Sequence, residues 1–523
     1  MKVVQDVIYV KQALILKEAK HLYKKLISED PTESLYLIHI IQRLGIEHHF
    51  EEEIEAALQK QYLIWSSHLS DFDNTHQLCE VALTFRLLRQ GGHYVNADLF
   101  HSLNSDKTKF GEKYGDDVKS LIALYEATQL SVEGEDSLDD VGYLSCDLLR
   151  SWLSRHQDHH EAIYVANTLQ NPLHYGLSRF LDRSIFLSDF KTKNEWTCLE
   201  ELANINSCIV RFMNQNEITE VYKWWKEVGM GKEEKFARYQ PLKWYTWPMA
   251  CFTDPRFSEQ RIELTKTISL IYVIDDIFDV YGTLDQLTLF TDAVNRWDLS
   301  GTEQLPDFMK TCLSVLYDTT NDFAEKVYKM HGLNPIDTLK KSWVRLLNAF
   351  LEEAHWLNSG QLPKAEEYLN NGIDSTGVHV VLVHAFFLFD KGITKESVAI
   401  MEKGIPNIIY SVAKILRLSD DLEGAESEDQ NGLDGSYIHC FMNENQEVSA
   451  QDAQRHVVQL ISSEWKRLNR EILTPNSFSS SFNNFCLNAA RMVPLMYQYR
   501  RNPSLSILRE QVKSLLNVCA GHI

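Results

Sequence analysis

The chain has 523 residues, of which 44% are hydrophobic, and carries a formal net charge of −21. This length predicts roughly two to four domains, and the apolar share is enough for buried cores. The acidic balance argues against a nucleic-acid or anionic-membrane partner, because phosphate-rich surfaces bind clustered lysine and arginine. The nine cysteines are scattered and form no CxxC pair, which predicts buried thiols in a reducing compartment and neither a zinc site nor a disulfide framework.

The first 25 residues predict the first helix of the mature fold, since they contain neither an apolar core followed by a cleavage site nor a leader rich in serine and arginine. No apolar run approaches the ~20 residues of a membrane span, and the longest, at 378–389, contains two histidines. We therefore expect a cytoplasmic protein without a membrane span, and a plastid location if a leader precedes this chain.

Helical periods of apolar residues run along nearly the whole chain, whereas alternating strand patterns are scarce. With 22 glycines and 12 prolines, the chain has too few turn residues for a many-stranded β protein. The polar stretch 188–200 separates the first group of helices from larger, more aromatic ones. These patterns predict an all-α fold with two helical domains, 1–190 and 191–523, of which the second holds the chemistry.

The segment 264–283, LTKTISLIYVIDDIFDVYGT, sets three acids into otherwise apolar helical sequence. An apolar stripe leads into Asp275 and Asp279 on one helical face, with Asp276 beside them, and Gly282 is expected to end the helix. Carboxylates at a helix C-terminus face the negative end of the dipole, which costs up to ~1 kcal/mol each. A hard divalent cation such as Mg²⁺, which prefers carboxylate oxygens, would offset this cost.

A second apolar stripe, in the segment 408–430, also runs into acids. Its positions are spaced by four and end in Asp420, Gly424 and Glu428, with Asp421 alongside. One such acidic pair alone usually marks a helix end or a solvated face. Two clusters that each end an apolar stripe favour opposed walls of one cavity that binds several metal ions and a polyphosphate.

These motifs resemble those of plant class I terpene synthases, and the resemblance extends over essentially the whole chain. DDIFD at 275–279 resembles the family's aspartate-rich motif, and DDLEGAESE at 420–428 resembles its second metal motif. Further matching segments are IQRLGIEHHFEEEI at 41–54, FRLLRQGG at 85–92 and FARYQPLKWYTW at 236–247. The resemblance implies a catalytically silent N-terminal α-barrel-like domain, a C-terminal class I terpenoid synthase helical bundle, and a monomer.

The resemblance also implies a site for three Mg²⁺ ions, with Mn²⁺ as an alternative, that grips the diphosphate of a linear isoprenyl substrate. The implied ligands are Asp275 and Asp279 for two ions and Asp420 and Glu428 for the third, with Asp276 and Asp421 close by in supporting roles. Preorganised positive charge would then stabilise the departing diphosphate and yield an allylic cation.

Substrate contacts implied by the resemblance come from two arginines and several cavity residues. Arg417 and Arg238 match the family's diphosphate-binding arginines, and a guanidinium fork suits phosphate oxygens. Trp247 matches a cavity-facing tryptophan, and Tyr497 and Phe278 are weaker candidates. Thr376 and Gly377 match a helix break above the substrate.

The chain departs from the family pattern at three places. Gly424 occupies the Ser/Thr ligand position of the second motif, so a water or Ser427 would have to complete the third metal site. Gln240 replaces the second arginine of an RxR element. The paired-arginine motif that precedes the first helix in many cyclising relatives is absent, which together with the RYQ variant resembles the subfamily that makes acyclic terpene alcohols.

We therefore expect water to capture the cation and give a tertiary acyclic alcohol, nerolidol from farnesyl diphosphate or linalool from geranyl diphosphate. Three alternatives stay open: a cyclising sesquiterpene synthase, an isoprenyl chain-elongating transferase, and a non-enzymatic helical scaffold.

Overall fold

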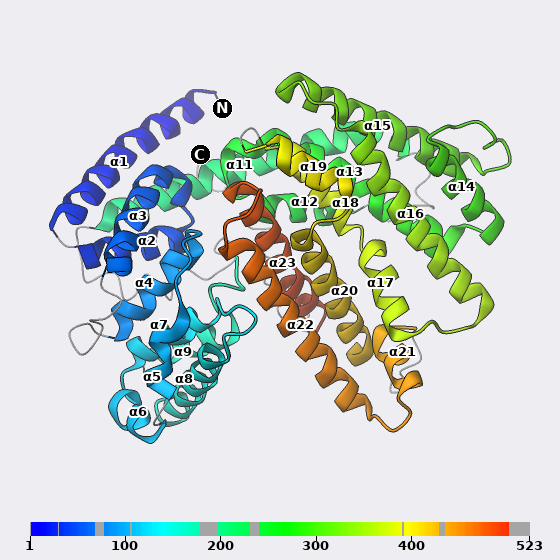
Figure 1. Ribbon diagram of the computed structural model, residues 1–523. Coiled ribbons are helices and arrows are strands. Elements are labelled where there is room, and N and C mark those ends of the chain that lie inside the picture. The colour runs from blue at the N-terminus through cyan, green and yellow to red at the C-terminus, as the bar shows by residue number, and fades with distance from the viewer. Residues whose placement is uncertain are drawn as a thin grey trace. The chain divides into compact units, whose positions relative to one another are not determined.

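The computed structural model describes residues 2–29, 31–67, 78–104, 107–159, 161–177, 196–230, 240–389, 392–427 and 435–501. Every regular element in these ranges is a helix, which confirms the predicted all-α class (Figure 1). The chain divides into two compact units, Met1–Arg211 with Asn469–Pro475, and Phe212–Leu468 with Asn476–Ile523. The boundary that we placed at residue 190 lies in the range 178–195, outside the described residues.

The first unit packs its helices around an apolar core to which α4 and α7 contribute buried side chains, among them Phe85 and Leu121. α4 is buried on nearly all sides. Nine of its thirteen residues are shielded from water: seven are apolar or small, and two are arginines. The elements of this unit are α1 (Lys2–Glu29), α2 (Pro31–Leu44), η1 (Glu47–His49), α3 (Glu51–Ser67), α4 (Leu78–Gln90), η2 (Ala97–Phe100), α5 (His101–Asn104), α6 (Lys107–Tyr114), α7 (Val118–Thr128), α8 (Asp136–Arg155), α9 (Ala162–Gln170) and the start of α11 (Thr197–Glu227).

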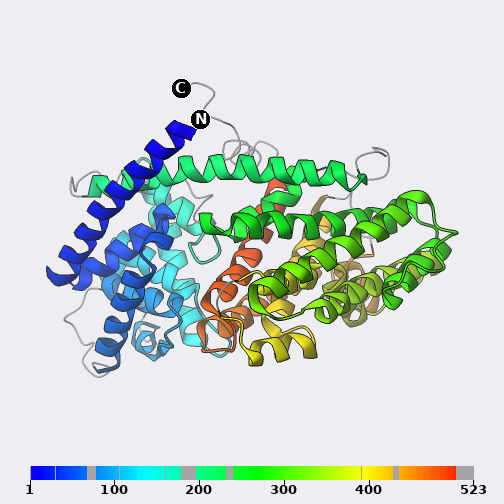
Figure 2. The same cartoon turned by 90° about the horizontal axis from the view of Figure 1, so that it is seen from above.

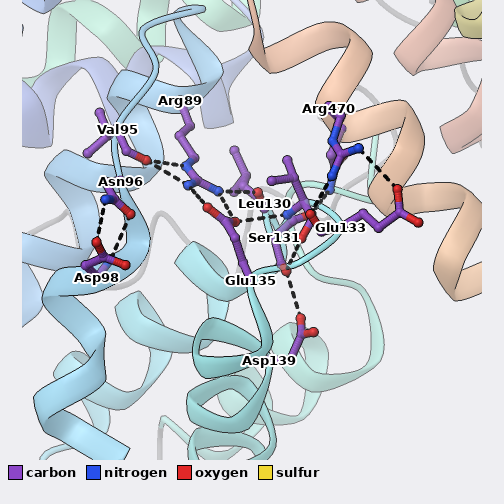
Figure 3. A network of polar contacts seen from close by, with 12 residues as sticks. Arg89, Val95, Asn96, Asp98, Leu130, Ser131, Glu133, Glu135, Asp139 and Arg470 are labelled. Atoms are coloured by element: carbon purple, nitrogen blue, oxygen red, sulfur yellow. Dashed lines mark hydrogen bonds and ion pairs between the residues drawn. The ribbon is translucent and has the colours of Figure 1, made fainter.

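A buried arginine of α4 organises the loop between α7 and α8 (Figure 3). Arg89 donates to the carbonyls of Val95 at 2.7 Å and Leu130 at 2.9 Å and pairs with the Glu135 carboxylate. At the end of α22 (Ala450–Leu473), Arg470 pairs with Glu133 of the same loop at 3.2 Å. Buried charges are tolerated only when such partners satisfy them. The network gives Arg89 of FRLLRQGG a structural role.

The second unit is a bundle whose long helices between residues 258 and 359 lie side by side (Figure 2). α13 packs against α12, α15 and α18, and α17 packs against both α16 and α20. The elements of this unit, besides the remainder of α11 and most of α22, are α12 (Pro241–Cys251), η6 (Pro255–Phe257), α13 (Ser258–Asp276), η7 (Ile277–Tyr281), α14 (Leu284–Arg296), α15 (Asp307–His331), α16 (Ile336–Ser359), α17 (Ala365–Ser375), α18 (Val378–Phe387), α19 (Lys395–Lys403), α20 (Asn407–Ser427), α21 (Tyr437–Glu444) and α23 (Ser480–Arg501).

A buried ion pair anchors the beginning of α13 to α11. Arg261 meets Glu217 with two parallel hydrogen bonds of 2.8 and 2.7 Å, and both side chains are 2% exposed. The Tyr245 hydroxyl of α12 donates to the same carboxylate at 2.5 Å. Because an unpaired charge at such a site costs about 3–5 kcal/mol, the pair fixes how α11, α12 and α13 meet.

Most of the apolar run at 378–389 forms α18, and nine of the ten residues of this helix are buried inside the second unit. Among the described helices, none combines the length and apolarity needed to cross a membrane.

Candidate active site

The acidic segment of α13 ends in a π-helical turn. α13 stops at Asp276, and η7 continues to Tyr281 and is closed by the amide of Gly282, which donates to the Ile277 carbonyl at 2.8 Å. Single π turns within α-helices often occur at functional sites. The regular α period that we assumed through Asp279 is therefore not the local geometry.

Gly282 ends this turn as predicted, although for a different reason. Its φ is −87°, so it does not use the left-handed conformation of a common glycine cap. Instead a Cβ at this position would stand 2.8 Å from Cγ of Leu287 and 3.0 Å from the Ile277 carbonyl oxygen. Only glycine leaves room for α14 to begin directly after the acidic segment.

The three aspartates of the motif differ in exposure. Asp276 is buried, Asp275 is half-buried and Asp279 is exposed. The apolar stripe before them follows the same gradient, since Ile268 is 4% exposed and Ile271 is half-buried. The acids thus lie where the buried helix reaches the surface. Asp275 and Asp279 are accessible enough to bind an ion, whereas the buried Asp276 suits a supporting role.

The second motif lies on α20, which continues without a break from Asn407 to Ser427. Asp420 is 38% exposed at its side chain, and Gly424 follows one turn later on the same face. Ser427 is the last residue of this helix, and its side chain lies outside the described part of the structure, so its suggested role stays a prediction. Glu428, the last residue of the motif, lies outside the described residues.

The buried Asp421 has protein partners for both of its carboxylate oxygens. It accepts hydrogen bonds from the Tyr368 hydroxyl at 3.0 Å and from the Tyr437 amide at 3.1 Å. Burial raises the pKa of Asp421 to about 6, although the nearby Arg417 opposes that shift. This arrangement suits a supporting role better than direct metal coordination.

Arg417 is held by the helix next to its own. Its Nε donates to the Gly372 carbonyl at 3.2 Å and its Nη2 to the Ser375 hydroxyl at 3.0 Å, both on α17. Nη1 lies 3.6 Å from Asp421 and 4.0 Å from Asp420. Arg238, the other predicted diphosphate ligand, lies outside the described residues.

Glu353 on α16, which the sequence did not single out, interacts with residues of both predicted metal segments, Asp279 and Arg417. The Ser375 hydroxyl donates to Glu353 at 2.6 Å, and the turn η7 that carries Asp279 packs against α16. Burial raises the pKa of Glu353; Arg417 opposes this shift, and the negative charge of Asp279 adds to it. One carboxylate is thus within electrostatic reach of both predicted walls. The only sequence signal was an acidic pair within the apolar helix WVRLLNAFLEEAHWL.

The predicted helix break at Thr376 and Gly377 is present between α17 and α18. Gly377 adopts φ +68°, and a Cβ there would stand 2.9 Å from Cγ2 of Ile271. The Thr376 hydroxyl donates to the Ile373 carbonyl at 2.8 Å and accepts from the Val378 amide at 3.2 Å. The break therefore packs one turn before Asp275 on α13.

The aromatic candidates have different surroundings. Trp247 is half-buried on α12, one turn after Lys243, whose ammonium lies 4.8 Å from the centre of the Tyr272 ring on α13. Phe278 is a core residue, because it is buried and packs on Phe350 with ring centres 5.4 Å apart. Tyr497 lies in α23, but its side chain is outside the described part of the structure.

The donor set of this region fits a divalent cation. Asp275, Asp279 and Asp420 offer partly exposed carboxylate oxygens, the kind of ligand that Mg²⁺ prefers. Within the described ranges, no three carboxylate, imidazole or thiol groups already converge as a metal site.

Comparison with known proteins agrees with this architecture. Residues 226–467 match the family model described as "Terpene synthase family, metal binding domain", and residues 4–173 match "Terpene synthase, N-terminal domain". The chain belongs to the terpene synthase family, and the resemblance on which we based the site is confirmed. The chain is therefore an enzyme, and the non-enzymatic scaffold that the sequence had left open is not supported.

Three relatives match more than nine tenths of this chain. A "Neryl diphosphate diphosphatase, chloroplastic" of Glycine max is 75% identical over 98% of this chain and 96% of its own length. An (E)-nerolidol synthase of Cannabis sativa is 45% identical over 92% of this chain and 88% of its own length. The "S-(+)-linalool synthase, chloroplastic" of Arabidopsis thaliana is 44% identical over 93% of this chain and 84% of its own length.

A solved structure of similar fold contains metal ions. Isoprene synthase from grey poplar (Populus x canescens), in complex with three Mg²⁺ ions and dimethylallyl-S-thiolodiphosphate, matches with a TM-score of 0.85 and 31% identity. The match covers 97% of this chain and 98% of that one. Together with the metal-binding family model, this likeness assigns this chain a divalent metal cofactor.

Proposed function

We propose that this enzyme ionises an acyclic prenyl diphosphate with the help of Mg²⁺ ions and that water captures the resulting cation to give an acyclic alcohol. The observation that carries the proposal is the contact chain from Arg417 through Ser375 to Glu353, which lies within electrostatic reach of Asp279. It joins a cationic group suited to phosphate with carboxylates suited to metal ions in one unit.

When bound, Mg²⁺ neutralises the diphosphate and makes it a better leaving group. We assign two ions to Asp275 and Asp279 and a third to Asp420 and Glu428. Arg417 would supply a further positive charge to the same diphosphate, with a planar fork of donors that matches phosphate oxygens. Because Asp276 and Asp421 are buried, their part is to hold these ligands in place.

Aromatic and apolar groups next to the acids would hold the hydrocarbon part of the substrate. Trp247 is half-buried on the face of α12 from which Lys243 reaches α13, and a π face stabilises an allylic cation. The break at Thr376 and Gly377 packs against the same stretch of α13. Arg238 and Tyr497 complete the proposed set of substrate contacts.

The departures at Gly424 and Gln240 favour water capture over cyclisation. Gly424 offers no side-chain ligand, and Gln240 offers no charge, so the departing diphosphate would be held less tightly. The names of the three relatives also describe either removal of diphosphate or formation of an acyclic alcohol. We propose a tertiary alcohol, nerolidol or linalool, from farnesyl or geranyl diphosphate.

One relative supports a second candidate for the substrate and product. The 75% identical protein is named for neryl diphosphate, the cis isomer of geranyl diphosphate, and for a diphosphatase reaction. Water attack at the primary carbon of this substrate would give a primary alcohol. The names of two of the three relatives also contain "chloroplastic", which supports the plastid alternative over the cytoplasmic location expected first.

Product analysis tests the function. Purified protein with Mg²⁺ should release inorganic diphosphate and an acyclic alcohol from at least one of neryl, geranyl and farnesyl diphosphate, as seen by gas chromatography. Asp275→Asn should lower turnover about a hundredfold or more, because a lost metal ligand forfeits several kcal/mol of transition-state stabilisation. Asp285→Asn, an exposed first-turn residue of α14, is the matched control and should retain activity. Cyclic products would contradict the water-capture proposal, and full activity of Asp275→Asn would contradict the metal assignment.

A further inference from the structure

One face of α17 forms a cradle for the side chain of Arg417. The cradle consists of Tyr368, Gly372 and Ser375, which are spaced by four and three residues and therefore share one helical face. The Tyr368 hydroxyl lies 3.5 Å from Nη1, the Gly372 carbonyl 3.2 Å from Nε, and the Ser375 hydroxyl 3.0 Å from Nη2. Each nitrogen of the guanidinium thus meets a different residue of one helix.

The glycine of the cradle provides the space that the arginine occupies. A Cβ at Gly372 would stand 3.1 Å from Cδ and Nε of Arg417 and 3.2 Å from its Cγ. Glycine within a helix costs about 1 kcal/mol relative to alanine. The close approach of the arginine gives a physical reason for glycine at this position of α17.

Ser375 differs from the other two cradle residues because its hydroxyl also bonds to Glu353 on α16. A hydroxyl has one proton to donate and two lone pairs to accept with. The Ser375 hydroxyl is buried, accepts from Arg417, and has two acceptors near its proton, Glu353 at 2.6 Å and Gly372 at 3.2 Å. The shorter bond to the carboxylate is favoured because it is charge-assisted. Ser375 therefore bridges a cation on α20 and an anion on α16.

We propose that Ser375 is a positioning residue for the diphosphate site. This role of Ser375 rests on the proposed function, in which Arg417 binds the substrate diphosphate. By holding the guanidinium on one side and the Glu353 carboxylate on the other, Ser375 keeps the two opposite charges from collapsing onto each other. Arg417 stays directed to the diphosphate, and Glu353 stays beside Asp279.

The first test measures binding of inorganic diphosphate in the presence of Mg²⁺ by calorimetry, so that the readout does not depend on turnover. Ser375→Ala should weaken the Kd about tenfold, because a hydrogen bond to a charged group is lost. Ser375→Thr, which keeps the hydroxyl, should stay within about threefold of the wild type. The matched control is Ser342→Ala on α16, a buried serine whose hydroxyl only donates to the Leu339 carbonyl of its own helix, and it should bind diphosphate normally.

Steady-state kinetics distinguish positioning from a general loss of packing. Ser375→Ala should raise KM and the half-saturating Mg²⁺ concentration together, while the threonine variant restores both. If the alanine variant does not fold, Ser375→Cys replaces it, since the thiol is similar in size but a weak hydrogen-bonding group and should also weaken diphosphate binding.

The outcomes separate this proposal from the proposed function. Normal diphosphate binding by Ser375→Ala, or by its cysteine substitute, together with weak binding by Arg417→Ala would overturn the role of Ser375 and leave the site intact. Failure of threonine to rescue would also overturn it, because the hydroxyl would not be the cause. Normal binding by Arg417→Ala would instead refute the diphosphate site itself.

Discussion

Gly377 offers a sharp test of how closely the helix break packs on the acidic helix. Its φ of +68° is unfavourable for any residue with a Cβ, at about 1–2 kcal/mol. The added Cβ of Gly377→Ala would also stand 2.9 Å from Cγ2 of Ile271, and overpacking of this kind costs about 1–3 kcal/mol. We therefore expect a total destabilisation of about 2–5 kcal/mol.

Gly332→Ala is the matched control. Gly332 follows α15 with the same φ of +68°, but nothing lies within 4 Å of where its Cβ would be. This variant should lower the free energy of unfolding only by the cost of the left-handed backbone conformation, about 1–2 kcal/mol. Differential scanning calorimetry should show roughly twice the fall in Tm for Gly377→Ala. Turnover at 25 °C should fall only in that variant, because Ile271 lies one turn before Asp275. Equal Tm shifts and equal activities would refute the reasoning.

Three other variants or conditions probe the rest of the structure. Gly424→Ser adds a hydroxyl one turn after the exposed acid of α20 and should lower the half-saturating Mg²⁺ concentration several-fold; unchanged metal dependence would place position 424 outside the metal site. Burial lowers the pKa of His379 and of His384 from 6.5 to about 4, so the unfolded chain binds their protons first as pH falls. Stability should drop from about pH 6.5 downward, by about 2 kcal/mol per histidine at pH 5, and a urea midpoint that is flat between pH 7 and pH 5 would contradict this. Arg261→Leu leaves Glu217 buried without its partner and should cost about 3–5 kcal/mol, measured by the same urea titration; a loss below 1 kcal/mol would mean that water reaches the carboxylate.

The sequence was sufficient to predict the fold class, and it pointed to two acidic segments whose role as walls of one metal site stays a prediction. Helical periods, few glycines and few prolines indicated an all-α chain, and the two acidic stripes were each recognisable because they interrupt an apolar face. The break at Gly377 and the helix end at Gly282 were also predicted correctly. These features are local, so a single segment contains the information.

The parts that the sequence did not reveal depend on contacts between helices. Glu353 looked like one acid of an ordinary pair, and only the packing of η7 and α17 against α16 shows that it lies near Asp279 and binds Ser375. Ser375 has no motif of its own, since its importance comes from its two charged partners. The π turn at 277–281 was missed because a regular period was assumed through the motif. Glu428 and Arg238 lie outside the described residues and stay predictions.

The position of an oxygen label tests the central claim most directly. Turnover of neryl, geranyl and farnesyl diphosphate in H₂¹⁸O, with Mg²⁺ present, separates ionisation of the carbon–oxygen bond from attack on phosphorus. Ionisation followed by water capture puts ¹⁸O in the alcohol and none in the released diphosphate. Label in the inorganic products with unlabelled alcohol would show a phosphatase-type cleavage and contradict the account.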